Sequence, residues 1–388
     1  MDRLLVVNTG SSSIKFAEFA VEGRHLAPRA PTSGSIDHLD QIAPPSDARG
    51  PLLGSALQRV FDFLDQAREP DDRLVAIGHR VVHGADAFTV ATVIDESVEA
   101  EIERLCPLAP LHNPSNLAGI RLARRAYPTV PQVAVFDTAF HASIPPYAAS
   151  YAIPQDLAAG QRVRRWGFQG TSCAYVARTT AAYLGKALDE LQVIICHIGS
   201  GASVTAIRDG RSIDTSMGMT PLEGLVMGTR SGDIDPAVVP YLMEVADLSG
   251  PEVLDLLTQR SGLLGLCGDS DTRAVRRRAE AGDPSAVLAL AVYAHRIRRY
   301  VGAFMTQLPD LDAVVFTAGV GEHDHALRHE VLSPLRHLGL HIGEQRNAEV
   351  TDPLGPAPIH DNGAAPALLV VPTDEEREIA QQTLRAAL

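Results

Sequence analysis

Apolar residues follow two alternating patterns along the chain. Continuous β-branched runs predict buried strands over 74–84, 131–140 and 313–319, and at the start of 367–388. Apolar residues at helical spacing predict helices over 55–67, 114–127, 172–185, 236–246, 251–260 and 284–308, and at the end of 367–388. Strands that alternate with helices indicate an α/β fold.

Two segments share the pattern of a strand, a tight turn and a second strand. They are 4-LLVVNTGSSSIKFAEF-19 and 193-VIICHIGSGASVTAIRDG-210. Superposing Gly10 on Gly199 aligns the apolar strands with each other. The match indicates an internal duplication, although two hairpins can also resemble each other by chance.

Two segments are predicted to lack long regular elements. The Pro-rich stretch 144-IPPYAASYAIP-154 can continue neither a helix nor a strand, which makes it the candidate crossover between domains. The stretch 28–51 is rich in Pro, Ser and Asp and is predicted to be a loop.

Composition narrows the class of protein. A chain of 388 residues with 45% hydrophobic and 21% charged residues predicts two globular domains, and no apolar run reaches the length of a membrane span, so we expect a cytoplasmic protein. The net charge of −13 argues against general binding to nucleic acid or to an anionic membrane. The four cysteines form no Cys-x-x-Cys pair, which favours reduced thiols over a disulfide framework or a zinc site.

Four glycine-rich loops follow predicted strands, although the chain has no P-loop motif. They are 8-NTGSSS-13, 197-HIGSGAS-203, 228-GTRSGD-233 and 317-TAGVGEH-323. Glycines allow backbone N–H groups to converge on an anion. Together with Arg80 and Arg230, these loops predict a cleft that handles phosphate.

Nine segments resemble the acetate and propionate kinase family, in the same order and across essentially the whole chain. They are VNTGSSSIKF, GHRVVHG, LAPLHNP, VFDTAFH, WGFQGTS, CHIGSG, TPLEGLVMGTRSGDIDP, VFTAGVGE and VPTDEE. The seventh segment, residues 220–236, is highly specific by itself.

The resemblance implies the superfamily of actin, sugar kinases and heat-shock chaperones. Its members have two duplicated actin-like, ribonuclease H-like α/β domains with a nucleotide cleft between them. We therefore expect an N-terminal domain over 1–147 plus 374–388, and a C-terminal nucleotide-binding domain over 148–373. The implied reaction is reversible transfer of the γ-phosphoryl group of ATP to acetate or propionate, with Mg²⁺ or Mn²⁺ as the metal.

The chemistry explains the residue types that the resemblance implies for the acceptor. A carboxylate is already ionised at neutral pH, so cations must offset the approach of one anion to another. By resemblance, Arg80 holds the carboxylate, Arg230 bridges it to the phosphoryl group, and Asp137 orients the waters of Mg²⁺ or an arginine. The implied apolar pocket, which would also fit plain core packing, consists of Val82, Leu111, Phe168 and Pro221.

The resemblance also implies ligands for the metal and the nucleotide. Asn8 and Glu375 match the Mg²⁺ site, and Lys15 would meet a phosphate as a point charge. The implied phosphate, ribose, base and adenosine contacts are His197, Ile198, Gly199, Ser200, Gly201, Asp271, Thr272, Arg273, Gly319, Val320, Gly321, Glu322 and His323.

The stretch 164-RRWGFQGTSC-173 departs from the family at a position implied to be catalytic. The family has a histidine at Gln169, assigned to stabilising the transition state. Glutamine keeps a neutral N–H donor but cannot carry positive charge, so we expect Gln169 to face the transferring phosphoryl group. Further departures are Cys173, Ser200, Thr272 and His323.

These departures leave alternatives open. We expect a slower carboxylate kinase that forms a homodimer and binds a small carboxylate and a nucleotide, with no nucleic-acid or membrane partner. A nucleotide-binding regulatory protein with little turnover and a kinase with another phosphoryl donor, such as pyrophosphate, are the two rivals.

Overall fold

The computed structural model describes residues 1–10, 13–27, 32–36 and 49–388. The chain divides into two compact units. The first consists of Met1–Ala142, Gly170–Ser172 and Asp374–Leu388, and the second of Ser143–Gln169 and Cys173–Thr373. These units differ from the predicted domain ranges at 143–147 and 170–172. The described part of the chain contains no helix with the length and hydrophobicity to cross a membrane.

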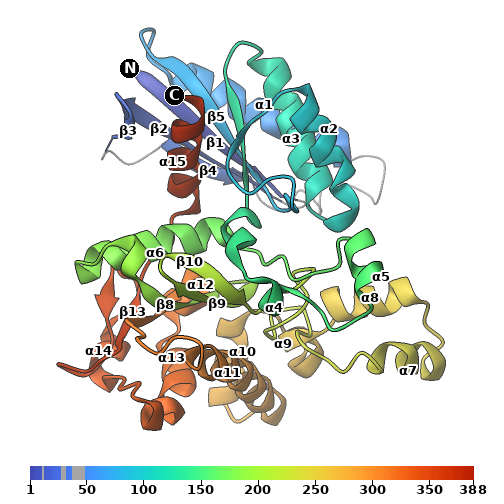
Figure 1. Cartoon of the computed structure of the whole chain (residues 1–388), viewed down its shortest axis with the longest axis vertical. Helices are drawn as coiled ribbons and strands as arrows, with labels where there is room; N and C mark the ends of the chain where they lie inside the picture. Colours follow the sequence, from blue (N-terminus) through green and yellow to red (C-terminus); the bar gives the residue numbers. More distant parts are fainter. Residues whose placement is uncertain (11–12, 28–31, 37–48) are drawn as a thin grey trace. The chain divides into compact units, whose positions relative to one another are not determined.

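The first unit consists of a mixed sheet with helices on both faces (Figure 1). Its strands are β1 (Asp2–Thr9), β2 (Ile14–Glu22), β3 (His25–Leu26), β4 (Thr32–Ile36), β5 (Arg73–Val81), β6 (Thr92–Val93) and β7 (Gln132–Phe136). Its helices are α1 (Arg49–Ala67), α2 (Glu96–Arg104), α3 (Asn113–Ala126) and α15 (Glu375–Ala387).

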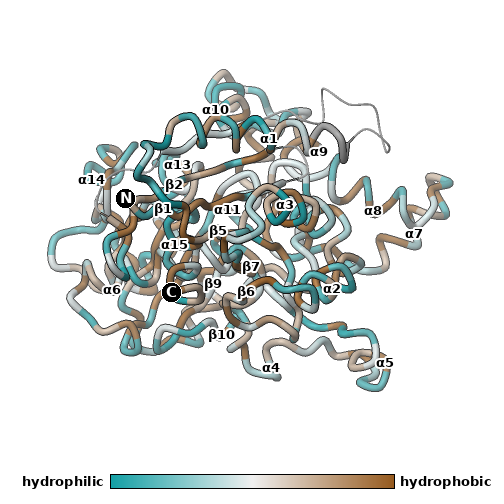
Figure 2. The backbone as a smooth tube through the Cα atoms, turned by 90° about the horizontal axis from the view of Figure 1, so that it is seen from above, coloured by the Kyte–Doolittle hydropathy of each residue, from teal (hydrophilic) through white to brown (hydrophobic). Residues whose placement is uncertain are grey.

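Alternation along β1 builds two cores, one on each face of this sheet. Leu5 and Val7 pack with α1 and α3, whereas Leu4 and Val6 pack with α15. Successive side chains of a strand point to opposite faces, so a central strand covered on both sides is apolar at every position. Figure 2 shows β1 as a hydrophobic segment, in contrast to the hydrophilic helix α10 (Thr272–Glu280).

The second unit repeats this architecture. Its strands are β8 (Gln192–Ile198), β9 (Ala202–Arg208), β10 (Arg211–Thr215), β11 (Ala313–Thr317), β12 (Ala357–Pro358) and β13 (Ala367–Val370). Its other helices are α4 (Pro146–Ala149), α5 (Gln155–Gly160), α6 (Gly170–Leu184, which begins in the first unit), α7 (Val238–Val245), α8 (Gly250–Gln259), α9 (Gly262–Cys267), α11 (Pro284–Met305), α12 (Ala318–His323), α13 (His325–Leu332) and α14 (Glu344–Glu349).

The two sheets have the same topology. In the first, β1, β5 and β7 are parallel neighbours, β2 and β3 continue antiparallel on one side, and β6 closes the other side. In the second, β8, β11 and β13 are parallel, β9 and β10 continue antiparallel, and β12 closes the other side. The predicted class, two duplicated α/β units, is therefore confirmed.

Two local predictions, the loops 28–51 and 317–323, need correction. The predicted loop 28–51 contains β4, which pairs with β2, and α1 begins at Arg49; residues 28–31 and 37–48 lie outside the described residues. Within the Pro-rich stretch 144–154, predicted to lack long regular elements, the one-turn helix α4 has Pro146 at its first position, where its missing N–H costs nothing. The glycine-rich segment 317–323 is not a loop, since Ala318–His323 forms α12.

Close packing between β5 and α15 predicts a sensitive position. A Cβ atom on Gly78 would lie 2.3 Å from Thr383 Oγ1 and 3.0 Å from Ile379 Cγ2. Gly78→Ala should therefore lower the free energy of unfolding by about 1–3 kcal/mol, measured by urea denaturation. Gly302→Ala in α11 is the control, because nothing lies within 4 Å of the added Cβ, and it should be neutral or stabilising. Equal stability of Gly78→Ala and the parent would contradict this packing.

Candidate active site

Arg80 and Asp137 lie at one edge of the first sheet. Arg80 is near the end of β5, and Asp137 directly follows its parallel neighbour β7. The Arg80 guanidinium donates from Nε to both carboxylate oxygens at 3.1 Å, and from Nη2 to Oδ2 at 2.6 Å. The Asp137 side chain is only 1% exposed, so a buried carboxylate fixes this guanidinium from one side.

The electrostatics keep Arg80 charged. Burial by itself lowers the pKa of Arg80, but the negative charges of Asp137 and Glu375 raise this pKa above its ordinary value. Its Nη1 donates to Asn8 Oδ1 at 3.4 Å, a long contact that an anion could replace. Arg80 therefore has a fixed orientation and a nitrogen available for a ligand.

The first turn of α6 holds Asp137 from the other side. Thr171 Oγ1 donates to Asp137 Oδ1 at 3.2 Å, and the backbone N of Gly170 donates to the backbone O of Asp137 at 3.1 Å. A Cβ on Gly170 would lie 2.1 Å from that oxygen. The close approach therefore requires glycine here.

The proposed metal ligands lie in the first unit. Asn8 is opposite Lys15 in the β1–β2 ladder, and Glu375 is the first residue of α15. Glu375 is close enough to Arg80 to raise its pKa. An amide oxygen and a carboxylate suit Mg²⁺, which keeps most of its water and takes few protein ligands. The described residues contain no group of three or more His, Cys, Asp or Glu that could hold a metal ion.

Arg230 has a different environment in the second unit. Its Nη1 donates to the backbone O of Pro221 at 3.3 Å and lies 3.7 Å from Met227 Sδ. No carboxylate pairs with it among the residues that the structure describes. Burial lowers the pKa of Arg230. A partly buried guanidinium that contacts only a carbonyl and a thioether has an uncompensated charge, which favours an anion beside it.

Gln169 lies in the same unit, directly before α6. Its Nε2 donates to the backbone O of Gly201 at 3.2 Å, and its Oε1 accepts from Ser203 Oγ at 2.6 Å. The amide is therefore tied to the turn between β8 and β9. One of its two N–H groups remains for another acceptor.

A pocket of about 870 Å³ collects many of the predicted nucleotide contacts. Among its lining residues are Gly199, Ser200, Asp271, Thr272, Arg273, Gly319, Val320 and His323. The lining does not include the predicted residues His197, Ile198, Gly201, Gly321 and Glu322. It does include Gly228, from the glycine-rich segment 228–233, and residues that the sequence did not single out, namely Ser270, Arg276, Glu280, Tyr293, Asp324, His325 and Ala326.

Comparison with known proteins identifies the family. A family model described as the acetokinase family matches residues 3–381. The acetate kinase of Streptomyces avermitilis is 49% identical over 98% of this chain and 96% of its own. The propionate kinase of Francisella tularensis subsp. tularensis has a TM-score of 0.87 at 37% identity, over 99% of this chain and 100% of its own. The acetate kinase of Porphyromonas gingivalis has a TM-score of 0.86 at 34% identity, over the full length of both chains.

This chain belongs to the acetokinase family. It is a phosphotransferase with a carboxyl group as acceptor, and the family uses ATP. The family resemblance stated from the sequence is thereby confirmed.

Three of the departures from the family pattern line the pocket of about 870 Å³. Ser200 and Thr272 line it, and His323 does so from the end of α12. The His323 ring is held by Gly319 O, 2.7 Å from Nδ1, and its Nε2 lies 3.4 Å from Asp352 Oδ1.

Two buried asparagines that the sequence did not single out hold the strand ends of the first unit. Asn116 accepts from Val82 N at 3.1 Å and donates to Thr9 O at 2.6 Å. Asn113 accepts from His83 N at 3.1 Å and donates to His83 O at 3.0 Å. The segment LAPLHNP, which contains Asn113, was the available signal.

A fully buried arginine supports α12, whose residues help to line the pocket of about 870 Å³. Arg328 donates from Nη1 to Gly321 O at 2.9 Å and to Glu322 O at 2.8 Å, and from Nε to Asn347 Oδ1 at 2.7 Å. Burial lowers the pKa of Arg328 to about 10. The guanidinium therefore satisfies carbonyls at the end of α12. Glu322 Oε1 accepts from Ala318 N at 2.7 Å at the start of the same helix.

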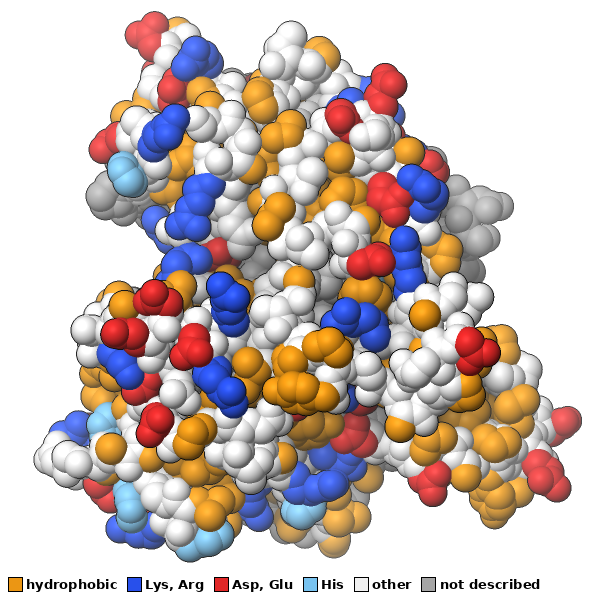
Figure 3. Space-filling model, viewed as in Figure 1, with side chains coloured by type: hydrophobic (Ala, Val, Ile, Leu, Met, Phe, Trp, Pro, Cys, Tyr) orange, Lys and Arg blue, Asp and Glu red, His pale blue; other side chains and the backbone are white. Residues whose placement is uncertain are grey.

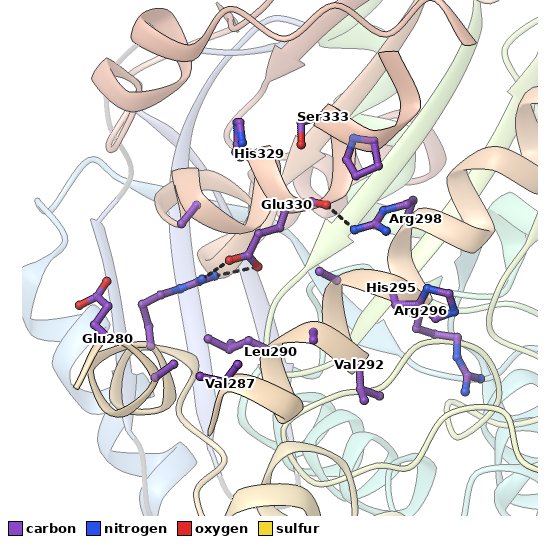
Figure 4. Close-up of a pocket in the computed structure, with 16 residues that line it drawn as sticks. Glu280, Val287, Leu290, Val292, His295, Arg296, Arg298, His329, Glu330 and Ser333 are labelled. Carbon is purple, nitrogen blue, oxygen red and sulfur yellow. Dashed lines mark hydrogen bonds and ion pairs between the residues drawn. The ribbon is translucent and has the colours of Figure 1, made fainter. Parts of the chain in front are cut away.

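A second pocket of about 950 Å³ adjoins the first between α10, α11 and α13 (Figure 4). Arg276 and Glu280 line both pockets. Arg276 is held by Asp324 and Glu330, and Arg298 Nη2 donates to Glu330 O at 2.6 Å. None of the predicted site residues lines this second pocket.

The Arg80–Asp137 geometry predicts that charge alone will not suffice at position 80. Arg80→Lys should lower kcat/KM for the carboxylate by about a hundredfold or more, because lysine cannot make the two-point contact with Asp137. Arg121→Lys is the matched control, since Arg121 also pairs with two carboxylates, Glu99 and Glu103, away from these residues. Steady-state kinetics of both variants test this, and parental kcat/KM in Arg80→Lys would contradict it.

Proposed function

We propose that this chain transfers the γ-phosphoryl group of ATP reversibly to acetate, with propionate as a second acceptor. The observation that carries the proposal is the contrast between two arginines. Arg80 is fixed by a buried carboxylate, whereas Arg230 contacts only a carbonyl and a thioether. The first arrangement suits orientation of an acceptor carboxylate, and the second suits neutralisation of phosphoryl oxygens.

The reaction needs cations rather than a general base. The acceptor is ionised at neutral pH, and its oxygen attacks phosphorus in line with the departing ADP oxygen. Arg80 holds the acceptor, Asp137 orients Arg80, and Arg230 stabilises charge on the equatorial oxygens. The remaining N–H of Gln169 donates to the transferring group.

Mg²⁺ would be held by Asn8 and Glu375, as their oxygen donors suit it. When bound, it would neutralise charge on the phosphate oxygens. Lys15, opposite Asn8 in the sheet, would add a further point charge for a phosphate.

Four side chains are proposed to contact the acceptor, Val82 and Leu111 of the first unit and Phe168 and Pro221 of the second. Val82 and Phe168 are buried, at 6% and 2% exposed, whereas Leu111 is 55% exposed. Pro221 is half-buried, and its carbonyl also binds Arg230. Small apolar side chains around the methyl group of acetate would exclude long acids.

The nucleotide pocket supports ATP over pyrophosphate as the donor. A volume of about 870 Å³ lies in the range of pockets that enclose a nucleoside-sized ligand. The residues proposed for base and ribose, Asp271, Thr272 and Arg273, line this pocket. Pyrophosphate would leave that part without a ligand.

Hydroxamate trapping of the acyl phosphate tests acceptor and donor together. Acetate, propionate, butyrate and valerate are each offered with ATP, GTP and pyrophosphate. We expect turnover of acetate and propionate with ATP, and a mild preference between them, because one methylene is worth about 1–3 kcal/mol in such a pocket. Preference for valerate would contradict the acceptor pocket, and turnover with pyrophosphate alone would contradict the donor. Absence of turnover with every pairing would favour the regulatory alternative.

We also propose a homodimer that uses the exposed apolar face of α7 and α8. Tyr241, Met243 and Val245 of α7 are 62%, 39% and 57% exposed, and Leu254 of α8 is 56% exposed. In Figure 3 hydrophobic side chains gather in the region where Figure 1 places these helices. A cluster of exposed large apolar side chains supports a protein–protein interface.

Charge on this face should separate the protomers. In light scattering, the double variant Tyr241→Glu with Val245→Glu should have the mass of a monomer, 41.4 kDa. The parent should have twice that mass. Val90→Glu is the control, because Val90 is 68% exposed in the other unit. A dimeric double variant would place the interface elsewhere, and a monomeric parent would contradict the dimer itself.

A further inference from the structure

The backbone of Gln169 adopts a conformation that side chains other than glycine rarely occupy. Its φ and ψ are 61° and 24°, in the left-handed region. Gly167, two residues earlier, also has a positive φ of 75°. A non-glycine residue stays in this region when the surrounding contacts hold it there.

Two hydrogen bonds determine which way the Gln169 amide faces. The backbone O of Gly201 can only accept, so the amide nitrogen must face it, at 3.2 Å. Oε1 is then left to accept from the Ser203 hydroxyl, at 2.6 Å. A flipped amide would place two oxygens against each other at Gly201. Ser203 is fully buried, and its hydroxyl, which can donate or accept, donates here because Oε1 is the amide atom that faces it.

The same contacts converge on the turn that borders the nucleotide pocket. Gly201 O accepts from Gly199 N at 3.0 Å, which closes the turn, and also from Gln169. Gly199 and Ser200 line the pocket. A Cβ on Gly201 would lie 3.5 Å from Gln169 Nε2 and 3.6 Å from Arg230 Nη1. The amide nitrogen and the guanidinium therefore flank one glycine.

We propose that Ser203 is a positioning residue for phosphoryl transfer. Gly201 O sets which end of the Gln169 amide is the nitrogen, and the buried Ser203 hydroxyl anchors the oxygen end, so that one N–H clamps the turn at Gly201 and the other is held beside Arg230. The inference rests on the proposed function, because the presented N–H matters to catalysis only if the phosphoryl group passes there. It explains how a neutral amide can occupy this position with a defined donor direction.

A double-mutant cycle tests the orientation through kinetics. Ser203→Ala should lower kcat about tenfold, as expected for loss of one well-aligned hydrogen bond, and should leave KM for the carboxylate within about twofold. In the Gln169→Met background, which keeps the length of the side chain but removes the amide, Ser203→Ala should change kcat by less than about twofold. An equal loss in both backgrounds, or no loss in the parental background, would overturn the proposal.

A matched control separates positioning from simple loss of a buried hydroxyl. Ser216 is also fully buried, and its Oγ accepts from Val204 N at 3.0 Å. Val204 is the residue next to Ser203 in β9. It has no hydrogen bond to Gln169. Ser216→Ala should therefore retain a kcat near that of the parent, and a tenfold loss there as well would overturn a specific role of Ser203.

A measurement independent of turnover distinguishes failure of this inference from failure of the proposed function. In protein labelled with ¹⁵N-glutamine, the side-chain signals that disappear in Gln169→Met belong to Gln169. These signals should shift in Ser203→Ala and stay in place in Ser216→Ala. Unshifted signals in Ser203→Ala would overturn the inference, whether or not the enzyme phosphorylates acetate.

Discussion

A carboxylate kinase must hold two anions against their mutual repulsion, and the charged groups of this chain are arranged around that constraint. The Asp137 carboxylate pairs with the Arg80 guanidinium and fixes its direction. Arg230 has no such partner among the described residues and retains its full charge for a ligand. In the proposed function, Arg80 supplies the geometry and Arg230 supplies net positive charge for the anionic reactants, in a chain whose net charge is −13.

The duplicated fold puts these groups at equivalent places. In the first sheet, Asn8, Arg80 and Asp137 lie at or just beyond the carboxyl ends of the parallel strands β1, β5 and β7. In the second sheet, Gly199 and Ala318 follow the equivalent strands β8 and β11. Beyond the carboxyl ends of parallel strands, backbone groups no longer form the hydrogen bonds of the sheet, and they can turn toward a ligand.

The pattern of apolar residues predicted the main strands and helices well, because burial on both faces leaves a continuous signal. The errors occurred where packing or chain context overrode local composition. β4 contains Thr, Ser and Gly but pairs with β2 along five residues. α12 contains two glycines, yet Glu322 and Arg328 satisfy groups at its two ends.

The sequence by itself determined the family, the α/β class, the duplication and the residue types that can meet a carboxylate, a phosphate and a metal. Those properties depend on motifs and on periodicity, which are local. The tertiary structure decided which side chains are partners. Arg80 and Asp137 are 57 residues apart and meet because β5 and β7 pair in register. Gln169 and Ser203 are 34 residues apart, and the direction of the Gln169 amide follows from a carbonyl that can only accept a hydrogen bond.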